Sequence, residues 1–483
     1  MTKKFIKKTK IIASVGPATW SEDKILELYQ AWVNVIRINF SHAEYDQVRK
    51  VVARVNKLNT AWKTKLALLW DLKWPEIRLG DYEGKKTYHT WDIFHISIDE
   101  SANLGELDQY CDYPYLLENM HEGYILKIES GIFDVEVLEV LEKSIKVKAL
   151  NDAALSARRH VNLPGISIKL PGLIEQDLKD IEFCIQEWFN YIAMSFVRHA
   201  NHVQELRAIL NKHDASTIWI IAKIEDQEWL DNVEDIVKVS DGVMVARGDL
   251  GIEIPIAHIP VAQQTIINLC LKYGKISIVA TQLIESMMET PFPTRAEVSD
   301  IFNAVSQQTD AVMTSGETAI GQYPIESIRM MQSIILEAER SISYHYKDYI
   351  SLEKSPAEQK RKFLLKSALE MAENLDVSAV VIFTKNGGFA RTAAAYRPAS
   401  NIFAFTEDWT TFTNVALYFG VKSRYEKFTY HVDGLERALK WLITYKDIDQ
   451  NDTVIVVSES KRGGAYHPSL EIINVAEFFD TIH

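Results

Sequence analysis

The chain has 483 residues, of which 47 % are hydrophobic, so it can bury a large core and its length favours roughly two to four domains. A net charge of -13 disfavours binding to nucleic acids and to anionic membrane surfaces. The basic start lacks the apolar run of a signal peptide, and no segment resembles a membrane span. Cys111, Cys184 and Cys270 form no CxxC pair, which is typical of reduced thiols. These features predict a cytoplasmic protein.

Short apolar runs rich in β-branched residues recur between residue 11 and about residue 315, and most are followed by a helical pattern of roughly 15 to 25 residues. That spacing suits right-handed βαβ units, and eight such units predict a closed (β/α)8 barrel. The eight runs are KIIASVGPA, VIRINFSH, LALLWDLK, YIAMSFVR, TIWIIAKIED, DGVMVARGD, KISIVATQ and TDAVMTSGE.

The third and fourth runs are separated by a long segment, 80–166, in which apolar and polar residues alternate with period two. This pattern predicts a small β-rich domain inserted into the barrel, and a lid is its natural role. A new α/β alternation begins after about residue 350 and predicts a separate doubly wound domain. We therefore expect a barrel (1–79 and 167–340), an inserted β domain (80–166) and a C-terminal α/β domain (341–483).

Charged residues gather where the predicted barrel strands end. The carboxyl ends of barrel strands carry the reactive groups, and side chains two residues apart share a face. On this basis we group Arg37, Asn39 and Ser41; Asp71 and Lys73; Lys223 and Glu225; Arg247 and Asp249; with Thr281, Ser315 and Glu317 completing the ring.

Burying so many charges costs several kcal/mol per ion unless each is paired or bound to metal, so a function explains the cluster better than stability does. Glu225 and Asp249 could hold a hard divalent cation through oxygen. Lys223 and Arg37 could neutralise a phosphoryl group during its transfer. Any one of these pairs alone would be an ordinary solvated ion pair; their repetition at successive strand ends is the stronger signal.

At these residues the sequence resembles the pyruvate kinase family across nearly its whole length. The resemblance implies a catalytic barrel, an inserted lid domain and a C-terminal domain, usually in a homotetramer. It also implies transfer of the phosphoryl group of phosphoenolpyruvate to ADP, giving pyruvate and ATP. The stretches that carry it are KIIASVGPAT, NVIRINFSH, PEIRLG, VNLPG, SFVRHA, IAKIED, DGVMVARGDLGIEIP, ATQLIESM, PTRAEVSD and SGETAIGQYP.

The resemblance also implies roles for residues that match the family's motifs. It assigns catalysis to Lys223, Arg37 and Thr281, and substrate binding to Lys223, Gly248, Asp249, Thr281 and Ser195. It assigns nucleotide contacts to Arg37, His42, Arg78 and Arg159, Mg²⁺ (or Mn²⁺) binding to Glu225 and Asp249, and K⁺ binding to Asn39, Ser41, Asp71 and Leu72.

Several positions depart from the family pattern. Glu76 resembles the potassium-dependent members, whereas Leu72 replaces the threonine usual in that group. Arg159 and His160 stand where the family has lysine and glycine, which weakens the nucleotide contact implied there.

Tryptophan stands at several positions where the family prefers glycine. Random drift rarely replaces glycine so consistently with the largest side chain. Our hypothesis is that UGA codons encoding glycine were read as tryptophan; the alternative is a genuine, aromatic-rich sequence. The positions are Trp32, Trp74, Trp91, Trp188 and Trp229, with Trp62 and Trp70 as further candidates.

In the C-terminal domain, FTKNGGFARTAAAYRP leads from a predicted strand through a glycine turn into a helix. A glycine turn at a helix start suits an anion, and the family resemblance implies a phosphorylated effector here. A plain turn without a ligand is an equally good interpretation. The candidate contacts are Thr384, Lys385, Asn386, Gly387, Gly388 and Arg391.

Two other functions remain open. A metal-dependent lyase or aldolase on a similar barrel could use the same Lys, Glu and Asp residues on an oxo acid, and it would need no nucleotide. A non-catalytic relative could instead bind sugar phosphates or protein partners. The presence of Lys223, Glu225, Asp249 and Thr281 argues against that last alternative, whereas Trp74 and His160 favour it.

Overall fold

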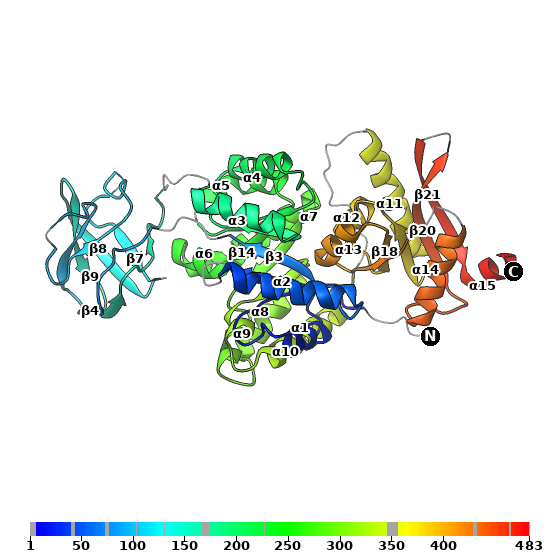
Figure 1. Ribbon diagram of the computed structural model, residues 1–483, viewed down its shortest axis with the longest axis horizontal. Coiled ribbons are helices and arrows are strands. Elements are labelled where there is room, and N and C mark those ends of the chain that lie inside the picture. The colour runs from blue at the N-terminus through cyan, green and yellow to red at the C-terminus, as the bar shows by residue number, and fades with distance from the viewer. Residues whose placement is uncertain are drawn as a thin grey trace.

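A closed barrel of parallel strands occupies the middle of the molecule (Figure 1). The computed structural model describes residues 6–39, 44–72, 77–102, 104–118, 120–129, 131–166, 173–226, 228–344, 356–427, 432–462 and 465–482. In these residues eight parallel strands close the barrel, which confirms the predicted fold class. They are β1 (Lys10–Ser14), β2 (Val35–Asn39), β3 (Ala67–Asp71), β12 (Tyr191–Met194), β13 (Trp219–Ile224), β14 (Gly242–Ala246), β15 (Ile276–Ala280) and β16 (Ala311–Thr314).

Helices cover the outside of the barrel, so its strands are buried on both faces and form near-continuous apolar runs. Local signals fix where helices begin: Ser21 accepts the amide of Lys24, and Thr294 forms a reciprocal capping box with Glu297. The helices are α1 (Glu22–Gln30), α2 (Tyr45–Thr60), α3 (Glu175–Gln186), α4 (Ala200–Lys212), α5 (Glu228–Val239), α7 (Ile259–Tyr273), α8 (Arg295–Ser306) and α10 (Pro324–Ser341), with short α6 (Arg247–Glu253), η2 (Ile256–His258), η3 (Glu285–Met288) and α9 (Gly316–Ala319).

The insertion between β3 and β12 forms two sheets around its own apolar core (Figure 1). Inward and outward residues alternate along its strands, as their period-two pattern predicts. A short neck joins it to the barrel, where Leu79 N–H donates to Arg159 O (2.8 Å) and Val161 N–H to Ile77 O (2.8 Å). Its strands are β4 (Lys85–Tyr88), β5 (Ile93–Ser97), β6 (Gln109–Tyr110), β7 (Ile125–Ile128), β8 (Phe133–Val140), β9 (Ser144–Ala149), β10 (Ala153–Ser156) and β11 (Val161–Asn162).

The C-terminal domain is built on a sheet of order β19-β18-β17-β20-β21. The sheet is parallel except for β21, which runs antiparallel to β20 as a long hairpin that the sequence pattern did not reveal. Its elements are α11 (Pro356–Asn374), β17 (Ala379–Phe383), α12 (Gly388–Ala395), β18 (Asn401–Thr406), α13 (Trp409–Asn414), η4 (Val415–Leu417), β19 (Val421–Tyr425), α14 (Val432–Thr444), β20 (Thr453–Arg462), β21 (Ala465–Asn474) and α15 (Val475–Ile482).

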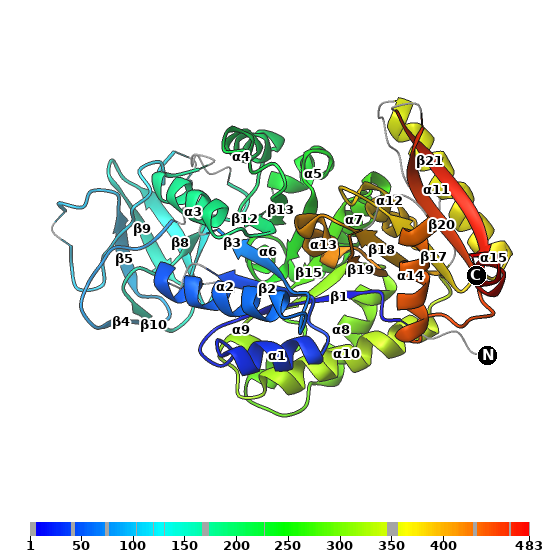
Figure 2. The same cartoon turned by 45° about the vertical axis from the view of Figure 1, so that its right-hand side comes forward.

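The C-terminal domain packs at the opposite end of the barrel from the insertion, against the amino ends of the strands (Figure 2). Side chains from the barrel interior and from this domain form one apolar cluster. A buried ion pair crosses the contact: Arg397 Nη2 lies 2.7 Å from Asp310 Oδ2. Asp310 also accepts the amides of Ser277 and Phe419, so the arginine holds an anion that ties the two domains together.

All three cysteines are buried free thiols. Burial raises the pKa of Cys111 to about 12 and raises the pKa values of Cys184 and Cys270 above their usual range. In the described part of the chain, no helix combines the length and the apolar character that a membrane span requires.

Replacing Arg397 with methionine should destabilise the protein by roughly 3–5 kcal/mol, because it leaves the buried Asp310 carboxylate without its cation. Urea unfolding followed by circular dichroism measures the loss. Arg340→Met removes a solvent-exposed ion pair with Glu337 and should cost less than about 1 kcal/mol. Equal losses in the two variants would contradict the role given to Arg397.

Candidate active site at the carboxyl end of the barrel

Lys223 lies at the centre of the charge cluster. It projects from the end of β13, and its Nζ is 2.8 Å from Glu225 Oε1, 3.3 Å from Asp71 Oδ1 and 2.7 Å from Ser195 Oγ. Burial works against its charge, but the three nearby carboxylates Asp71, Glu225 and Asp249 outweigh burial and raise its pKa. Lys223 is therefore a permanently charged ammonium at neutral pH.

Asp71 connects Lys223 to Arg37. Arg37 Nε and Nη2 lie 2.7 and 2.6 Å from Asp71 Oδ2, and Arg37 Nη1 donates to Ser14 Oγ (2.6 Å). Burial would raise the pKa of Asp71, but Lys223 and Arg37 hold it below its ordinary value. The sequence analysis missed Ser14; its signal was a polar side chain at the end of an otherwise apolar strand.

Glu225 and Asp249 form a pair of carboxylates beside this network. Glu225 binds Lys223 through Oε1 and accepts the amide of Phe196 through Oε2 (2.6 Å). Burial and the charge of Asp249 raise the pKa of Glu225 to about 7, against the opposing effect of Lys223. A divalent cation between these groups would remove that penalty.

The donor set fits a magnesium ion. Mg²⁺ is commonly held by one or two carboxylates and completes its octahedron with water and substrate oxygens. Among the described residues, no group of three or more His, Cys, Asp or Glu side chains forms an all-protein metal site. Glu225 and Asp249 match the arrangement in which two carboxylates hold Mg²⁺ and water or substrate oxygens supply the other ligands.

The structure corrects one grouping. Arg247 and Asp249 do not share a strand face, because β14 ends at Ala246 and residues 247–253 form α6. The helical turn sends Arg247 away from Lys223, and its Nη1 lies 2.7 Å from Asp300 Oδ2. Asp249 remains in the first turn of α6, facing the site closely enough to affect both Lys223 and Glu225.

Thr281 is fixed against α6. Its Oγ1 accepts the amide of Gly248 (2.8 Å) and donates to Ala280 O (2.7 Å), while its backbone has a positive φ of 64°. Glu317 is also buried. Its carboxylate binds within its own turn, where it accepts the amide of Ser315 (2.7 Å). Thr281 and Gly248 thus form one unit at the carboxyl ends of β14 and β15.

The residues expected to bind potassium are partly placed. Asn39 and Asp71 are direct neighbours in the register of β2 and β3. Leu72 follows Asp71, and its carbonyl accepts the hydroxyl of Ser195 (3.2 Å). Ser41 lies outside the described residues.

Two of the expected nucleotide contacts, Arg78 and Arg159, lie in the neck, whereas Arg37 belongs to the network around Asp71 and Lys223. Arg78 Nη1 donates to Arg158 O (2.8 Å), and Arg159 Nη1 lies 3.0 Å from Glu129 Oε1. His160 packs edge-on against Phe196, whose amide contacts Glu225, so the neck touches the charge cluster. His42, Lys73, Trp74 and Glu76 lie outside the described residues.

The glycine loop of the C-terminal domain is far from this cluster, between β17 and α12. Gly387 has a φ of 74°, which glycine adopts without strain, and Asn386 Oδ1 accepts the amide of Gly388 (3.2 Å). Thr384 is buried and donates its amide to Phe405 O, and Lys385 O accepts the Thr411 hydroxyl. Arg391 is in α12, where its amide bonds Gly387 O.

A second contact joins the insertion to the barrel. Asn162 Nδ2 donates to Glu253 Oε1 (2.7 Å) at the end of α6. Burial raises the pKa of Glu253 to about 7; Asn162 opposes the rise and the charge of Asp226 adds to it. Burial therefore favours the protonated form of this carboxyl group, against the hydrogen bond from Asn162.

This raised pKa predicts a pH-dependent stability. Between about pH 4.5 and 7 the folded state binds a proton at Glu253 that the unfolded state has released, so the free energy of unfolding falls as pH rises through this window. Glu253→Gln should flatten that part of the profile by on the order of 1–3 kcal/mol. Urea melts at pH 5, 6, 7 and 8 measure it, and profiles of identical slope would contradict it.

A barrel that gathers Lys and Arg around two carboxylates suited to a divalent cation at its carboxyl end has the features of a phosphotransferase. Family models agree: residues 6–328 match "Pyruvate kinase, barrel domain" and residues 362–470 match "Pyruvate kinase, alpha/beta domain".

Known proteins extend the match over almost the whole chain. Proteins named pyruvate kinase from Sporosarcina psychrophila and Borreliella burgdorferi are each 36 % identical, over 97 % and 94 % of this chain and 80 % and 94 % of their own lengths. The crystal structure of a pyruvate kinase from Cryptosporidium parvum superimposes with a TM-score of 0.88 at 30 % identity, covering 97 % of this chain and 96 % of that one. The chain belongs to the pyruvate kinase family.

Proposed function

We propose that this protein transfers the phosphoryl group of phosphoenolpyruvate to ADP, producing pyruvate and ATP. The observation that carries the proposal is the network in which Lys223 and Arg37 share Asp71 while Glu225 and Asp249 stand beside them. It supplies two cations for the migrating group and two oxygen ligands for a metal, which phosphoryl transfer requires.

Each group has a definite task in this reaction. Lys223 and Arg37 bind the phosphoryl oxygens and stabilise the charge that spreads over them in the transition state. Asp71 orients both cations, Ser195 accepts a hydrogen bond from Lys223, and Ser14 accepts one from Arg37. Glu225 and Asp249 would hold Mg²⁺ (or Mn²⁺), which when bound neutralises charge on the phosphates.

Residues around this network would bind the rest of both substrates. The backbone amides at Gly248 and Asp249 would contact the carboxylate of phosphoenolpyruvate. Thr281 lies beside Gly248, and the enolate carbon would be protonated there through water. Arg78, Arg159 and His42 would contact ADP. The neck carries Arg78 and Arg159, so movement of the insertion would bring nucleotide contacts and water exclusion together.

A potassium ion is proposed beside the same network. The amide oxygen of Asn39 and the carboxylate of Asp71 come from adjacent strand ends, and Ser41 and the Leu72 carbonyl would complete the set. We further propose a cytoplasmic homotetramer, with the 384–391 loop as the site of a phosphorylated effector; the glycine turn supports the last of these.

Lys223→Ala should lower kcat about 10³-fold or more, because it removes the ammonium that faces the transferring group. A coupled assay of pyruvate formation from phosphoenolpyruvate and ADP, with and without Mg²⁺ and K⁺, measures the rate. Lys238→Ala removes an exposed lysine that pairs with Asp235 on α5 and lies over the Tyr273 ring, outside the charge cluster, and it should leave the rate unchanged. Circular dichroism checks that the Lys223 variant is folded.

Two outcomes would count against the proposal. A folded Lys223→Ala protein with a retained rate would refute the role of that lysine. Turnover of oxo acids without any nucleotide would instead identify a lyase using the same side chains.

A further inference from the structure

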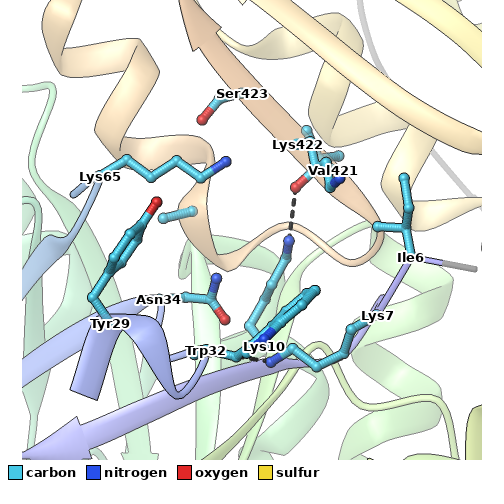
Figure 3. A pocket seen from close by; sticks show the side chains of 11 residues that line it. Ile6, Lys7, Lys10, Tyr29, Trp32, Asn34, Lys65, Val421, Lys422 and Ser423 are labelled. Atoms are coloured by element: carbon cyan, nitrogen blue, oxygen red, sulfur yellow. Dashed lines mark hydrogen bonds between the residues drawn. The ribbon is translucent and has the colours of Figure 1, made fainter. Parts of the chain in front are cut away.

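A second cluster of lysines surrounds a cavity at the other end of the barrel (Figure 3). The cavity has a volume of about 250 Å³ and lies between the amino ends of β1, β2 and β3 and the edge strand β19 of the C-terminal domain. Its lining is Ile6, Lys7, Lys10, Tyr29, Trp32, Asn34, Lys65, Ala416, Val421, Lys422 and Ser423.

The lining contains four lysines and no acidic residue. Lys10 Nζ donates to Val421 O (2.7 Å), and Lys7 Nζ to Trp32 O (3.3 Å), so both ammonium groups contact neutral carbonyls. Lys422 is paired with Asp447 (3.0 Å). The lining itself therefore holds lysines and no carboxylate, and the nearest carboxylates are outside it: Glu339 acts on Lys7 and Lys10, and Asp447 on Lys65 and Lys422.

Lys65 is the least compensated member. Within the described ranges, no hydrogen bond or ion pair of its ammonium group is found, and its polar end is directed toward the cavity in Figure 3. Burial and the repulsion of Lys422 lower its pKa to about 8, and Asp447 only partly opposes them. Burial likewise lowers the pKa of Lys7 to about 7, and burial with repulsion from Lys65 and Lys7 lowers that of Lys10.

Two neutral donors complete the lining. Asn34 Oδ1 accepts the amide of Ile11 (3.0 Å), so the Asn34 side-chain NH₂ is the part left to face the cavity. The hydroxyl of Tyr29 is directed toward the same space (Figure 3). Ammonium, amide and hydroxyl donors around one hollow are complementary to an oxyanion.

We propose that this cavity binds a small anion of the phosphate class, either inorganic phosphate or a phosphate monoester. The volume corresponds to roughly eight water molecules, which is enough for such an ion. A bound dianion would favour the charged forms of Lys7, Lys10 and Lys65 and would offset the repulsion between these ammonium groups in a partly buried site.

The occupant would join two domains. Lys7, Lys10 and Lys65 come from the barrel, whereas Lys422 comes from β19. An anion between them replaces repulsion across the domain contact with attraction, so its binding stabilises that contact and raises the melting temperature by mass action. The site is at the end of the barrel opposite to Lys223 and is independent of the catalytic assignment.

The test uses the full chain and three titrants: inorganic phosphate, glycerol phosphate, and chloride at matched ionic strength. Calorimetry and thermal melts should show binding of at least one phosphate species and a rise in melting temperature that chloride does not produce. Lys65→Met should weaken that affinity about tenfold or more. Lys63→Met removes the same charge from an exposed neighbour and should have no effect.

The relative affinities for glycerol phosphate and inorganic phosphate identify the class of anion that the cavity binds. Tighter binding of glycerol phosphate assigns the site to a phosphate monoester, and equal binding assigns it to phosphate itself. Stabilisation that is the same in wild type and Lys65→Met, or the same with chloride, overturns the proposal. These binding and melting measurements do not depend on catalysis, so they can be interpreted even if the proposed function is wrong.

A different observation supports a second inference. Trp32, Trp62, Trp91 and Trp188 have left-handed backbones, with φ of 79°, 58°, 78° and 59°, and their side chains are 41, 54, 67 and 80 % exposed. This conformation is normal for glycine and is strained for a residue with a β-carbon.

The surrounding hydrogen bonds explain why the chain needs it. After α1, Trp32 N–H bonds Tyr29 O (2.9 Å) and Val33 N–H bonds Leu28 O (3.1 Å), which is the Schellman helix ending. Trp62 and Trp188 end α2 and α3 with the same pair of bonds. The equivalent place is occupied by Gly274 after α7, by Asp214 after α4 and by Gln308 after α8.

Trp91 serves a tight turn instead. Asp92 N–H bonds His89 O (3.0 Å), which places Trp91 at the third position of the turn, where a positive φ calls for glycine. We infer that the natural polypeptide has glycine at residues 32, 62, 91 and 188, encoded by UGA. The backbone gives no such indication for Trp70, which is fully buried in β3, or for Trp229, which begins α5; Trp74 lies outside the described residues.

Residue 188 gives the sharpest test, because its side chain is the most exposed of the four. Trp188→Ala and Trp188→Gly remove the same contacts, but only glycine relieves the left-handed backbone. The unfolding equilibrium constant of Trp188→Gly should be about fivefold lower than that of Trp188→Ala. Equal stabilities would remove the physical basis of the inference.

Peptide mass spectrometry of the protein from its natural source decides the identity directly. Peptides with glycine at these four positions, and UGA at the corresponding codons, are expected. Peptides with tryptophan there would overturn the inference. Glycine at residue 32 would remove one side chain from the wall of the lysine cavity and would leave its four lysines in place.

Discussion

The active end of this protein depends on Asp71, one buried carboxylate that accepts two cations. It can do so because β3 lies beside β2, which carries Arg37, while Lys223 reaches Asp71 from β13, two strands away on the other side beyond β12. Side chains alternate along a strand, so a slip of one residue in the β2–β3 register would turn Arg37 or Asp71 toward the helices. The correct strand register in the barrel therefore also brings Arg37 and Asp71 together in the site.

Much of this could be predicted from the sequence, because the barrel strands are apolar runs with charged or polar residues at or just after their carboxyl ends. The pairing across strands could not. Which cation Asp71 accepts, and that Ser14 holds Arg37, depend on which strands become neighbours. Arg247 was misplaced for a local reason: a helix begins at the strand end, and the alternation that groups residues two apart then fails. The long β20–β21 hairpin likewise left no clear period in the sequence.

The two ends of the barrel treat lysine in opposite ways. At the carboxyl end, carboxylates outnumber the single lysine and raise its pKa, so its charge is secure. At the amino end, lysines face one another and neutral carbonyls, and their pKa values fall. Identical side chains thus hold a fixed charge in one place and form a set of weakly compensated donors in the other, and the difference lies in their neighbours.

The buried cysteines have a chemical consequence for the life of the protein. Peroxides and alkylating agents attack the thiolate rather than the thiol, and burial keeps Cys111, Cys184 and Cys270 in the protonated form. Their sulfur atoms are also shielded from reagents by the surrounding core. Oxidants that attack thiolates would therefore react slowly with these three cysteines for as long as the protein stays folded.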